Sequence, residues 1–318
     1  MKRLTHYHAC WVLLASMGIN ISSLAASSLA ATAFTSGASG ALSPDGRNTE
    51  VAQAVTAADS ALEEGINFVR EGNTEAAIDA FERAVALDSN SAAAHYNLGL
   101  ALRQSNQLQS AANSFWQATQ ADPDFALAYV NLGAALLEGD NLTQAQSYLN
   151  RALEIAPQMG MAHYNKGLLQ QREGDQTAAL ESFERAIAYS PSAAEPHYHA
   201  GVIYLSQGQY AAAQRAFENA IALNGNYAEA YYNLGVALVR QGNLEAALSK
   251  FSSAFELQPT FAHAYYAQAS ALTRLQRYDE AKSRIQSAIN IYVSQNNAQW
   301  ASLAQRQLTY IEGLQNNP

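Results

Sequence analysis

Residues 92–125 read AAAHYNLGLALRQSNQLQSAANSFWQATQADPDF, and the next stretch, residues 126–159, reads ALAYVNLGAALLEGDNLTQAQSYLNRALEIAPQM. Both stretches carry small, bulky and proline residues in the same order and at the same spacing. A sequence that resembles itself at a fixed period of 34 residues is typical of a chain built from stacked structural units, each packed on its neighbours. The sequence therefore predicts a repeat array.

The same period runs through most of the chain. It is marked by four series, namely a glycine, an alanine, a bulky apolar residue and a second alanine. Their members are Gly65, Gly99, Gly133, Gly167, Gly201 and Gly235, followed by Ala269; Ala77, Ala111, Ala145, Ala179, Ala213, Ala247 and Ala281; Phe81, Phe115, Leu149, Phe183, Phe217, Phe251 and Ile285; and Ala84, Ala118, Ala152, Ala186, Ala220, Ala254 and Ala288. Four series that share one period indicate seven repeats.

Each unit is predicted to hold two antiparallel helices. Apolar residues recur at steps of three and four, as in Leu98, Ala101 and Leu102, which is the spacing of one helix face. Between the two helices stands a residue that tolerates the left-handed conformation in which helices end. These residues are Gly72, Asn106, Asp140, Gly174, Gly208 and Gly242. The glycine and alanine are small so that the two backbones can approach, the bulky residue fills the seam to the next unit, and a proline ends the second helix in four units.

Residues 58–295 resemble the tetratricopeptide repeat family, whose unit is a helix–turn–helix of this length. The resemblance implies an all-α fold, a right-handed superhelical solenoid of seven helix–turn–helix repeats with a C-terminal capping helix. Residues 296–318 are predicted to form the cap, because Trp300, Leu308 and Ile311 fall on one helical stripe that would cover the open end of the seventh unit. The family pattern is broken before the glycine, where the usual leucine is replaced by Lys166, Ala200 and Gln268.

The start of the chain has the features of an export signal. A basic residue at Lys2, an apolar run and small residues up to Ala33 follow the order of a signal peptide. We expect residues 1–33 to be removed, leaving Phe34 first; the alternative is an uncleaved membrane anchor. Residues 34–57 are rich in Ser, Ala, Gly and Thr and are predicted to be a flexible leader.

Composition narrows the function. Cys10, the single cysteine, lies in the export segment, so the processed chain would have no disulfide and no thiolate chemistry. The net charge is −9 and there is no Lys/Arg-rich run, which argues against nucleic acid because phosphate neutralisation supplies most of that affinity. The sequence contains no phosphate-binding loop, metal-binding helix or serine elbow. We therefore expect no enzyme activity, no small-molecule cofactor and no metal site.

Three histidines, His95, His163 and His197, lie one or two repeats apart. They could form a metal-binding or pH-sensing row along one face. Alternatively, the imidazole replaces the aromatic residue that the family often has at a half-buried seam. The second interpretation is favoured.

A row of polar and aromatic residues lies on the first helices, just before the glycines. Its amides are Asn97, Asn131, Asn165 and Asn233, with His199 in the same place in the fifth unit, and its tyrosines are Tyr96, Tyr164, Tyr198, Tyr232 and Tyr266. In the family the first helices line the concave face, and an asparagine at this place can hydrogen-bond the backbone of an extended peptide. By resemblance, the row is the floor of a peptide-binding groove. A role in the fold alone is the alternative, and the sequence leaves both open.

These features together predict an exported scaffold, periplasmic or lumenal, that binds a protein or peptide partner. The resemblance implies roles in assembly, secretion or complex biogenesis. The alternative is a membrane-anchored, non-catalytic subunit of a larger enzyme or export complex, in which the N-terminal segment is uncleaved and meets the membrane.

Overall fold

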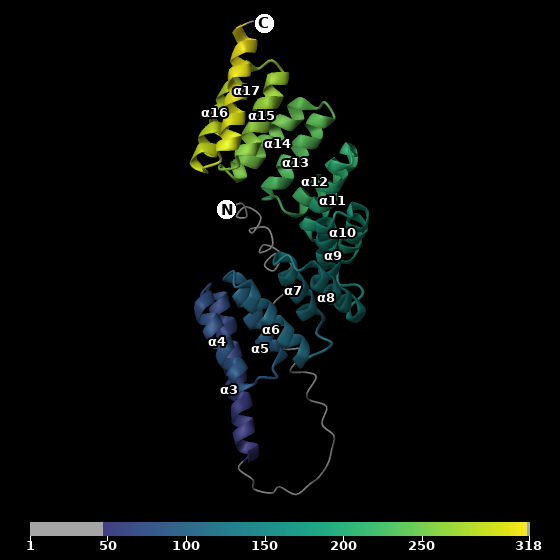
Figure 1. Ribbon diagram of the computed structural model, residues 1–318, viewed down its shortest axis with the longest axis vertical. Helices are drawn as coiled ribbons and strands as arrows, with labels where there is room; N and C mark the ends of the chain where they lie inside the picture. Colours follow the sequence, from purple (N-terminus) through teal and green to yellow (C-terminus); the bar gives the residue numbers. More distant parts are fainter. Residues whose placement is uncertain (1–46, 317–318) are drawn as a thin grey trace. The chain divides into compact units, whose positions relative to one another are not determined.

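The computed structural model describes residues 47–316, with side chains from residue 56 onward. Over these residues the chain forms fifteen α-helices and no strand (Figure 1). It divides into two compact units, one up to Ser182 and one from Phe183 onward. The odd-numbered helices from α3 to α15 each precede a partner helix, which gives seven two-helix repeats in the described residues, followed by α17. The predicted all-α repeat solenoid is confirmed.

The helices follow one another at nearly constant length. The first unit contains α3 (Arg47–Arg70), α4 (Thr74–Leu87), α5 (Ala92–Gln104), α6 (Leu108–Ala121), α7 (Ala126–Glu138), α8 (Leu142–Ile155), α9 (Gly160–Glu173) and the start of α10 (Gln176–Tyr189). The second unit contains the end of α10 and then α11 (Ala194–Ser206), α12 (Tyr210–Leu223), α13 (Ala228–Arg240), α14 (Leu244–Leu257), α15 (Ala262–Arg274), α16 (Tyr278–Ser294) and α17 (Ala298–Asn316).

The first helix begins earlier than the sequence pattern indicates. A flexible leader is expected over residues 34–57, but α3 starts at Arg47, so the second half of that segment is helical instead. Residues 50–57 are mainly Glu, Val, Gln and Ala without glycine, a composition that tolerates a helix, and the Gly/Ser-rich residues before them obscured it. Residues 34–46 and the expected signal segment, residues 1–33, lie outside the described residues.

The helix ends have the physical cause that the sequence predicts. All six residues expected between the two helices of a repeat adopt positive φ, from 61° at Asn106 to 89° at Gly174. Two further non-glycine residues, Gln276 and Asn296, do the same at φ 59° and 54°. At these positions the following N–H groups bond back into the last turn, as Gln107 N–H does to the Leu102 carbonyl at 2.9 Å, so the carbonyls at the helix end are satisfied.

The glycine and phenylalanine that recur at one spacing in most repeats are there because the ring packs on the bare backbone of the glycine. A Cβ added at Gly99 would lie 2.6 Å from the ring of Phe115, and one added at Gly201 would lie 2.7 Å from that of Phe217. The nearest atoms are those of the ring and not of the facing backbone. The glycine therefore makes room for the phenylalanine of its own repeat, which is a different reason from the close backbone approach expected from the sequence.

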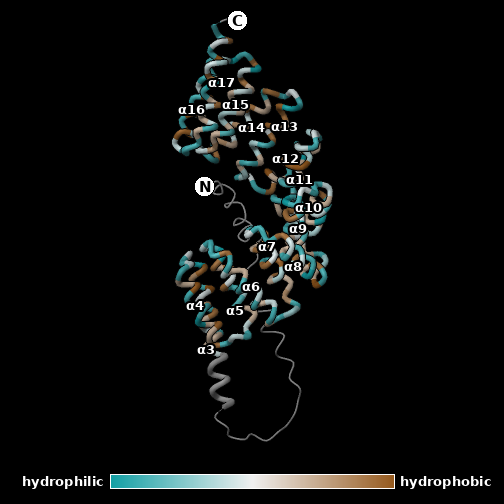
Figure 2. The backbone as a smooth tube through the Cα atoms, viewed as in Figure 1, coloured by the Kyte–Doolittle hydropathy of each residue, from teal (hydrophilic) through white to brown (hydrophobic). Residues whose placement is uncertain are grey.

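Each unit has its own hydrophobic core along the helix pairs. In the first unit Phe81 and Phe115 are fully buried, and in the second Phe217, Phe251 and Ile285 are. Figure 2 shows hydrophobic and hydrophilic residues mixed along the coloured helices, the pattern of amphipathic helices.

The last helix packs on the seventh repeat. Ala304 and Ile311 of α17 are fully buried in one cluster with Ile289 and Tyr292 of α16, and Trp300 packs against the same cluster. Among the described residues, none of the helices has the length and hydropathy needed to cross a membrane.

Candidate functional site

The asparagines of the predicted row are held by their own helices. In each case the side-chain Nδ2 donates a hydrogen bond to the backbone carbonyl four residues earlier. These bonds join Asn97 to Ala93 (2.8 Å), Asn131 to Leu127 (3.0 Å), Asn165 to Met161 (3.0 Å) and Asn233 to Glu229 (3.0 Å). The orientation of each amide is therefore fixed before any partner arrives.

A second bond links successive repeats within each unit. Asn131 Nδ2 donates to the Tyr96 hydroxyl at 3.2 Å, and Asn233 Nδ2 donates to the Tyr198 hydroxyl at 3.2 Å. The bond requires a tyrosine in one repeat and an asparagine 35 residues later, in the following repeat. Because Val130 stands where the tyrosine would be, the repeat after it has no such bond. The row is thus partly a set of clamps between repeats.

These bonds determine what the amides can offer. Both N–H groups of Asn131 and Asn233 are engaged, which leaves Oδ1 as the atom that can accept a further hydrogen bond. Asn131 is only 3% exposed and Asn165 only 6%, so these two amides of the predicted groove floor are buried in the free protein. Asn97 and Asn233 are half-buried. Asn233 therefore combines a fixed amide with an accessible surface.

The tyrosines differ in exposure along the row. Tyr96 and Tyr164 are buried, whereas Tyr198, Tyr232 and Tyr266 are half-buried. Burial raises the pKa of Tyr96 and of Tyr198 to about 12 and raises the pKa of Tyr232 as well. The hydroxyls are therefore neutral at physiological pH, and the half-buried rings present an apolar face with a polar tip.

His199 replaces the amide in the fifth repeat with a neutral ring. Its imidazole stacks on Phe183, with ring centroids 5.3 Å apart and planes at 24°, and meets the edge of Tyr198 at 5.2 Å. Burial lowers the pKa of His199 to about 4. At neutral pH this position carries no charge. The first unit contains three asparagines and two tyrosines of the row, and the second contains His199, Asn233 and three tyrosines. Direct contacts between row members join Asn131 to Tyr96, and Asn233 and His199 to Tyr198.

The tyrosine row has one more member that sequence reasoning missed. Trp300 lies 34 residues after Tyr266, and its ring meets the edge of Tyr266 at 5.7 Å and of His263 at 4.6 Å. The Tyr292 hydroxyl and His263 Nδ1 are hydrogen-bonded at 2.7 Å, and the Tyr292 ring stacks on Trp300 at 5.8 Å. The spacing alone could have identified Trp300, but the residue was assigned to the cap.

Two of the three histidines considered as a row have a structural partner. The ring Nε2 of His95 bonds the Ser89 carbonyl at 3.0 Å, and that of His163 bonds the Pro157 carbonyl at 2.9 Å. A carbonyl only accepts, so each ring donates its N–H to the turn that enters its repeat. Within the described residues, no group of three or more His, Cys, Asp or Glu side chains is arranged to hold a metal ion.

The cations near the ends of the first helices differ between the units. In the first unit Arg103 pairs with Glu138, and Arg172 pairs with Asp140 at 2.8 Å. In the second unit Arg240 is exposed at the end of α13 and makes no ion pair with any described residue. The cations of the first unit are therefore neutralised by carboxylates, although Arg103 lies close enough to Tyr96 to lower the pKa of that hydroxyl, against the larger effect of burial.

Comparison with known proteins agrees with the fold. Models described as tetratricopeptide repeats match residues 126–159, 198–260 and 238–306. A model described as a TPR repeat matches residues 67–104, 99–140 and 172–208. The chain belongs to the tetratricopeptide repeat family. A comparison with curated protein sequences gives no match.

Several solved structures are similar in fold. The APC/C hetero-tetramer Cut9–Hcn1 has 16% identity and a TM-score of 0.62, over 71% of this chain and 46% of that one. A structure of PilF from Pseudomonas aeruginosa has 20% identity and a TM-score of 0.58, over 65% and 94%. A tetratricopeptide repeat protein from Parabacteroides merdae has 16% identity and a TM-score of 0.56, over 81% and 99%. The chain matches less than half the length of the first structure, and identities this low establish the fold alone.

Proposed function

We propose that this protein is an exported scaffold that holds an extended segment of a partner protein against the first helices of its repeats. The family fold generally serves protein interaction and not catalysis, which supports a binding role. The observation that carries the proposal is the amide geometry at Asn233, where two internal bonds occupy Nδ2 and leave Oδ1 on a half-buried surface. An extended chain offers N–H groups that such an oxygen accepts.

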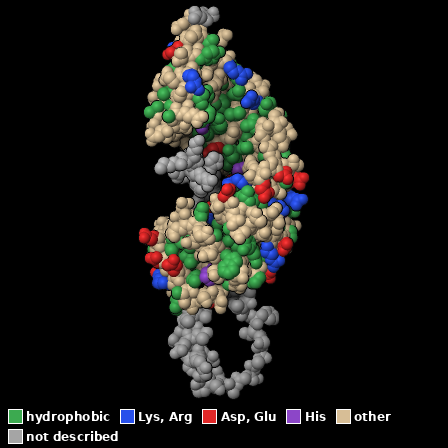
Figure 3. Space-filling view, in the orientation of Figure 1, with side chains coloured by type: hydrophobic (Ala, Val, Ile, Leu, Met, Phe, Trp, Pro, Cys, Tyr) green, Lys and Arg blue, Asp and Glu red, His purple; other side chains and the backbone are tan. Residues whose placement is uncertain are grey.

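The second unit supplies the apolar part of this surface. Tyr198, Tyr232, Tyr266 and Trp300 recur at the same repeat position and are all half-buried. Figure 3 shows that the visible face of the α11–α17 region is mostly hydrophobic and other neutral atoms, with a few charged side chains of both signs between them. Aromatic rings with neutral polar tips are enriched where proteins bind proteins. The partner segment is therefore one with an accessible backbone and apolar side chains, not one recognised by a terminal carboxylate.

The place of action follows from the N-terminal sequence. Residues 1–33 have the order of a signal peptide, so the scaffold would act in the periplasm or an equivalent lumen, in assembly, secretion or complex biogenesis. Mass spectrometry of the natural N-terminus tests this part. A chain beginning at Phe34 supports export with cleavage, and an intact Met1 would favour the anchored alternative.

Site-specific crosslinking tests the binding part. A photoreactive phenylalanine analogue replaces Tyr232 in the full chain, and a matched variant carries it at Leu257, an exposed residue at the end of α14. Irradiation in the native envelope extract is expected to crosslink a discrete partner from position 232 and not from 257. Equal products from both positions, or none from 232, would contradict the proposal.

A further inference from the structure

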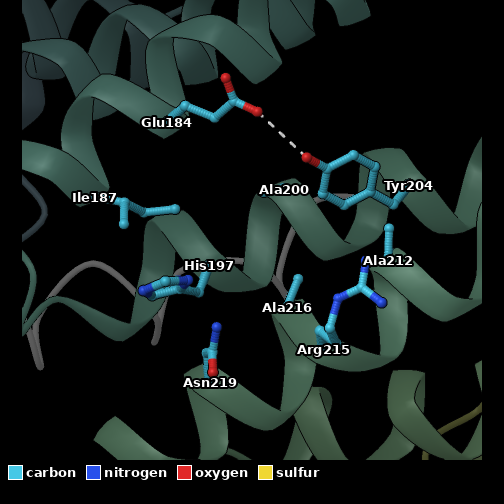
Figure 4. A pocket seen from close by; sticks show the side chains of 9 residues that line it. All are labelled: Glu184, Ile187, His197, Ala200, Tyr204, Ala212, Arg215, Ala216 and Asn219. Carbon is cyan, nitrogen blue, oxygen red and sulfur yellow. Dashed lines mark hydrogen bonds between the residues drawn. The ribbon is translucent and has the colours of Figure 1, made fainter.

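The second unit contains a hollow away from the tyrosine row. It is open to solvent and offers about 200 Å³ between the second helices α10 and α12 and the first helix α11. Figure 4 shows its apolar side formed by Ile187, Ala200 and Ala216, with Glu184 and Arg215 at different edges. On α11 the lining residues are spaced three and four apart and so share one helix face, which is not the face defined by Tyr198.

The hollow lies where this repeat has a small alanine at a position that is leucine in other repeats. Ala200 stands directly before the glycine, where other repeats carry Leu98, Leu132 and Leu234. Those three leucines are buried. An alanine at the same place leaves the volume of most of a leucine side chain unfilled, and native interiors rarely leave such volume empty.

Two other repeats also lack this leucine, and they show what fills the space. Lys166 Nζ donates to Asn150 Oδ1 at 3.3 Å, and Gln268 Nε2 donates to Ser252 Oγ at 2.8 Å. In both, an unbranched side chain extends from the first helix and its terminal N–H reaches the second helix of the preceding repeat. Glu184 occupies the same repeat position as Asn150 and Ser252.

At the fifth repeat the acceptor, Glu184 on the preceding helix α10, is present, but the residue at the leucine position supplies no donor to it. The Glu184 carboxylate accepts a bond from the Tyr204 hydroxyl at 3.3 Å, and Ala200 is too short to reach it. Among the described residues neither Glu184 nor Arg215 forms an ion pair. His197 lies at the edge of the hollow, and burial lowers its pKa, so a neutral ring borders the space and does not repel a cation.

We infer that this hollow binds a lysine side chain of a partner protein, whose carbon chain lies along Ile187, Ala200 and Ala216 and whose ammonium group donates to Glu184. A carboxylate near that lysine in the partner meets Arg215, because the two edges of the hollow carry opposite charges. The site is separate from the tyrosine row, so it gives the scaffold a second point of attachment and does not depend on the proposed groove. Lysine fits because its stem is apolar and its head is a strong donor.

A lysine introduced at position 200 tests whether an ammonium group in the hollow reaches Glu184. Ala200→Lys should reproduce the Lys166 arrangement and raise the melting temperature by about 2–4 °C, the shift that roughly 1 kcal/mol produces in a domain of this size. In the Glu184→Gln background the gain from lysine should be smaller, whereas the gain from Ala200→Leu, the matched control, should be the same in both backgrounds. A lysine effect that ignores Glu184 would overturn the assignment of the head group.

A peptide selection tests the partner. A library of random peptides displayed on phage is panned against the full chain and, in parallel, against Ala200→Leu, in which the hollow is filled. Peptides retained by the unaltered chain alone are expected to share a lysine close to an Asp or Glu. Changing that lysine to Leu, or Glu184 to Gln, should weaken binding about fivefold, the effect of an ion pair at a partly exposed site. Identical peptides from both proteins, or selective peptides without lysine, would overturn the proposal.

Discussion

The first helices of the two units share one repeat pattern but present different surfaces. In the unit up to Ser182 the row is rich in amides, and its tyrosines Tyr96 and Tyr164 are buried. In the unit from Phe183 onward the row is aromatic, and Tyr198, Tyr232, Tyr266 and Trp300 are half-buried. The backbone pattern determines where a side chain stands. The side-chain type and its bonds determine whether that position serves the fold or remains available to a partner.

The largest expected effect concerns the aromatic end of the second unit. Deleting residues 296–318 removes Trp300 and Ile311 and uncovers Tyr292, which is 1% exposed. Loss of the buried Ile311 and of the half-buried Trp300 and Leu308 should cost about 3–5 kcal/mol, since full burial of one such side chain contributes roughly 1.5–3 kcal/mol. In a repeat array that loss should fall on the last repeats. Hydrogen exchange should therefore show α15 and α16 losing protection while α5 to α8 keep theirs.

Tyr310→Ser is the matched control for this deletion, because Tyr310 is 58% exposed on the outer face of α17. It should leave exchange in α15 and α16 unchanged. If the deletion melts like the full chain and stays monomeric, α17 does not cap the array. The second unit would then not combine a packed C-terminal end with an accessible aromatic row.

The next effect separates the amides of the two units. Asn131→Ala leaves the buried Tyr96 hydroxyl without the amide that donates to it and removes the second bond to the Leu127 carbonyl, which keeps its helical N–H. The change should cost about 1–3 kcal/mol. Asn233→Ala removes the same two kinds of bond at a half-buried site where water can replace them, and should cost about 0.5–1.5 kcal/mol. Chemical denaturation of both variants measures the difference. Equal losses would mean that exposure does not distinguish the two amides.

The sequence predicted a large part of this fold for identifiable reasons. The left-handed residues from Gly72 to Gly242 and the spacing of glycine to phenylalanine are local properties, so they could be located without coordinates. The tyrosine–asparagine bonds were not predicted. They join residues 35 positions apart, as Asn131 and Tyr96 are, and depend on how one helix is rotated against the next. For the same reason the burial of Asn131 was missed.

Acid should destabilise the second unit through His199. Burial lowers the pKa of His199 to about 4 in the folded protein, against about 6.5 in an unfolded chain. The unfolded state therefore binds the proton more tightly. The stabilisation is fully present above about pH 6.5 and is lost as pH falls toward 4, by about 1–2 kcal/mol at pH 5. Melting between pH 7 and 5 should show a smaller decline in His199→Gln than in the unaltered chain, and parallel declines would exclude this histidine as the cause.

The smallest expected effect lies within the aromatic row and tests whether its tyrosines have distinct roles. The Tyr198 hydroxyl accepts a bond from Asn233, whereas the residue after Tyr266 is Ala267, so Tyr232 has no asparagine in the following repeat to bond. Tyr198→Phe should therefore cost about 0.5–1 kcal/mol, the net value of one hydrogen bond, while Tyr232→Phe should change the free energy of unfolding by less. Freed from Tyr198, the amide of Asn233 could also turn, so Tyr198→Phe should weaken crosslinking from position 232 even where the fold is intact. If Tyr232→Phe is the more costly change, the hydroxyl of Tyr232 has a structural role, and the division of the row into clamping and available tyrosines is wrong.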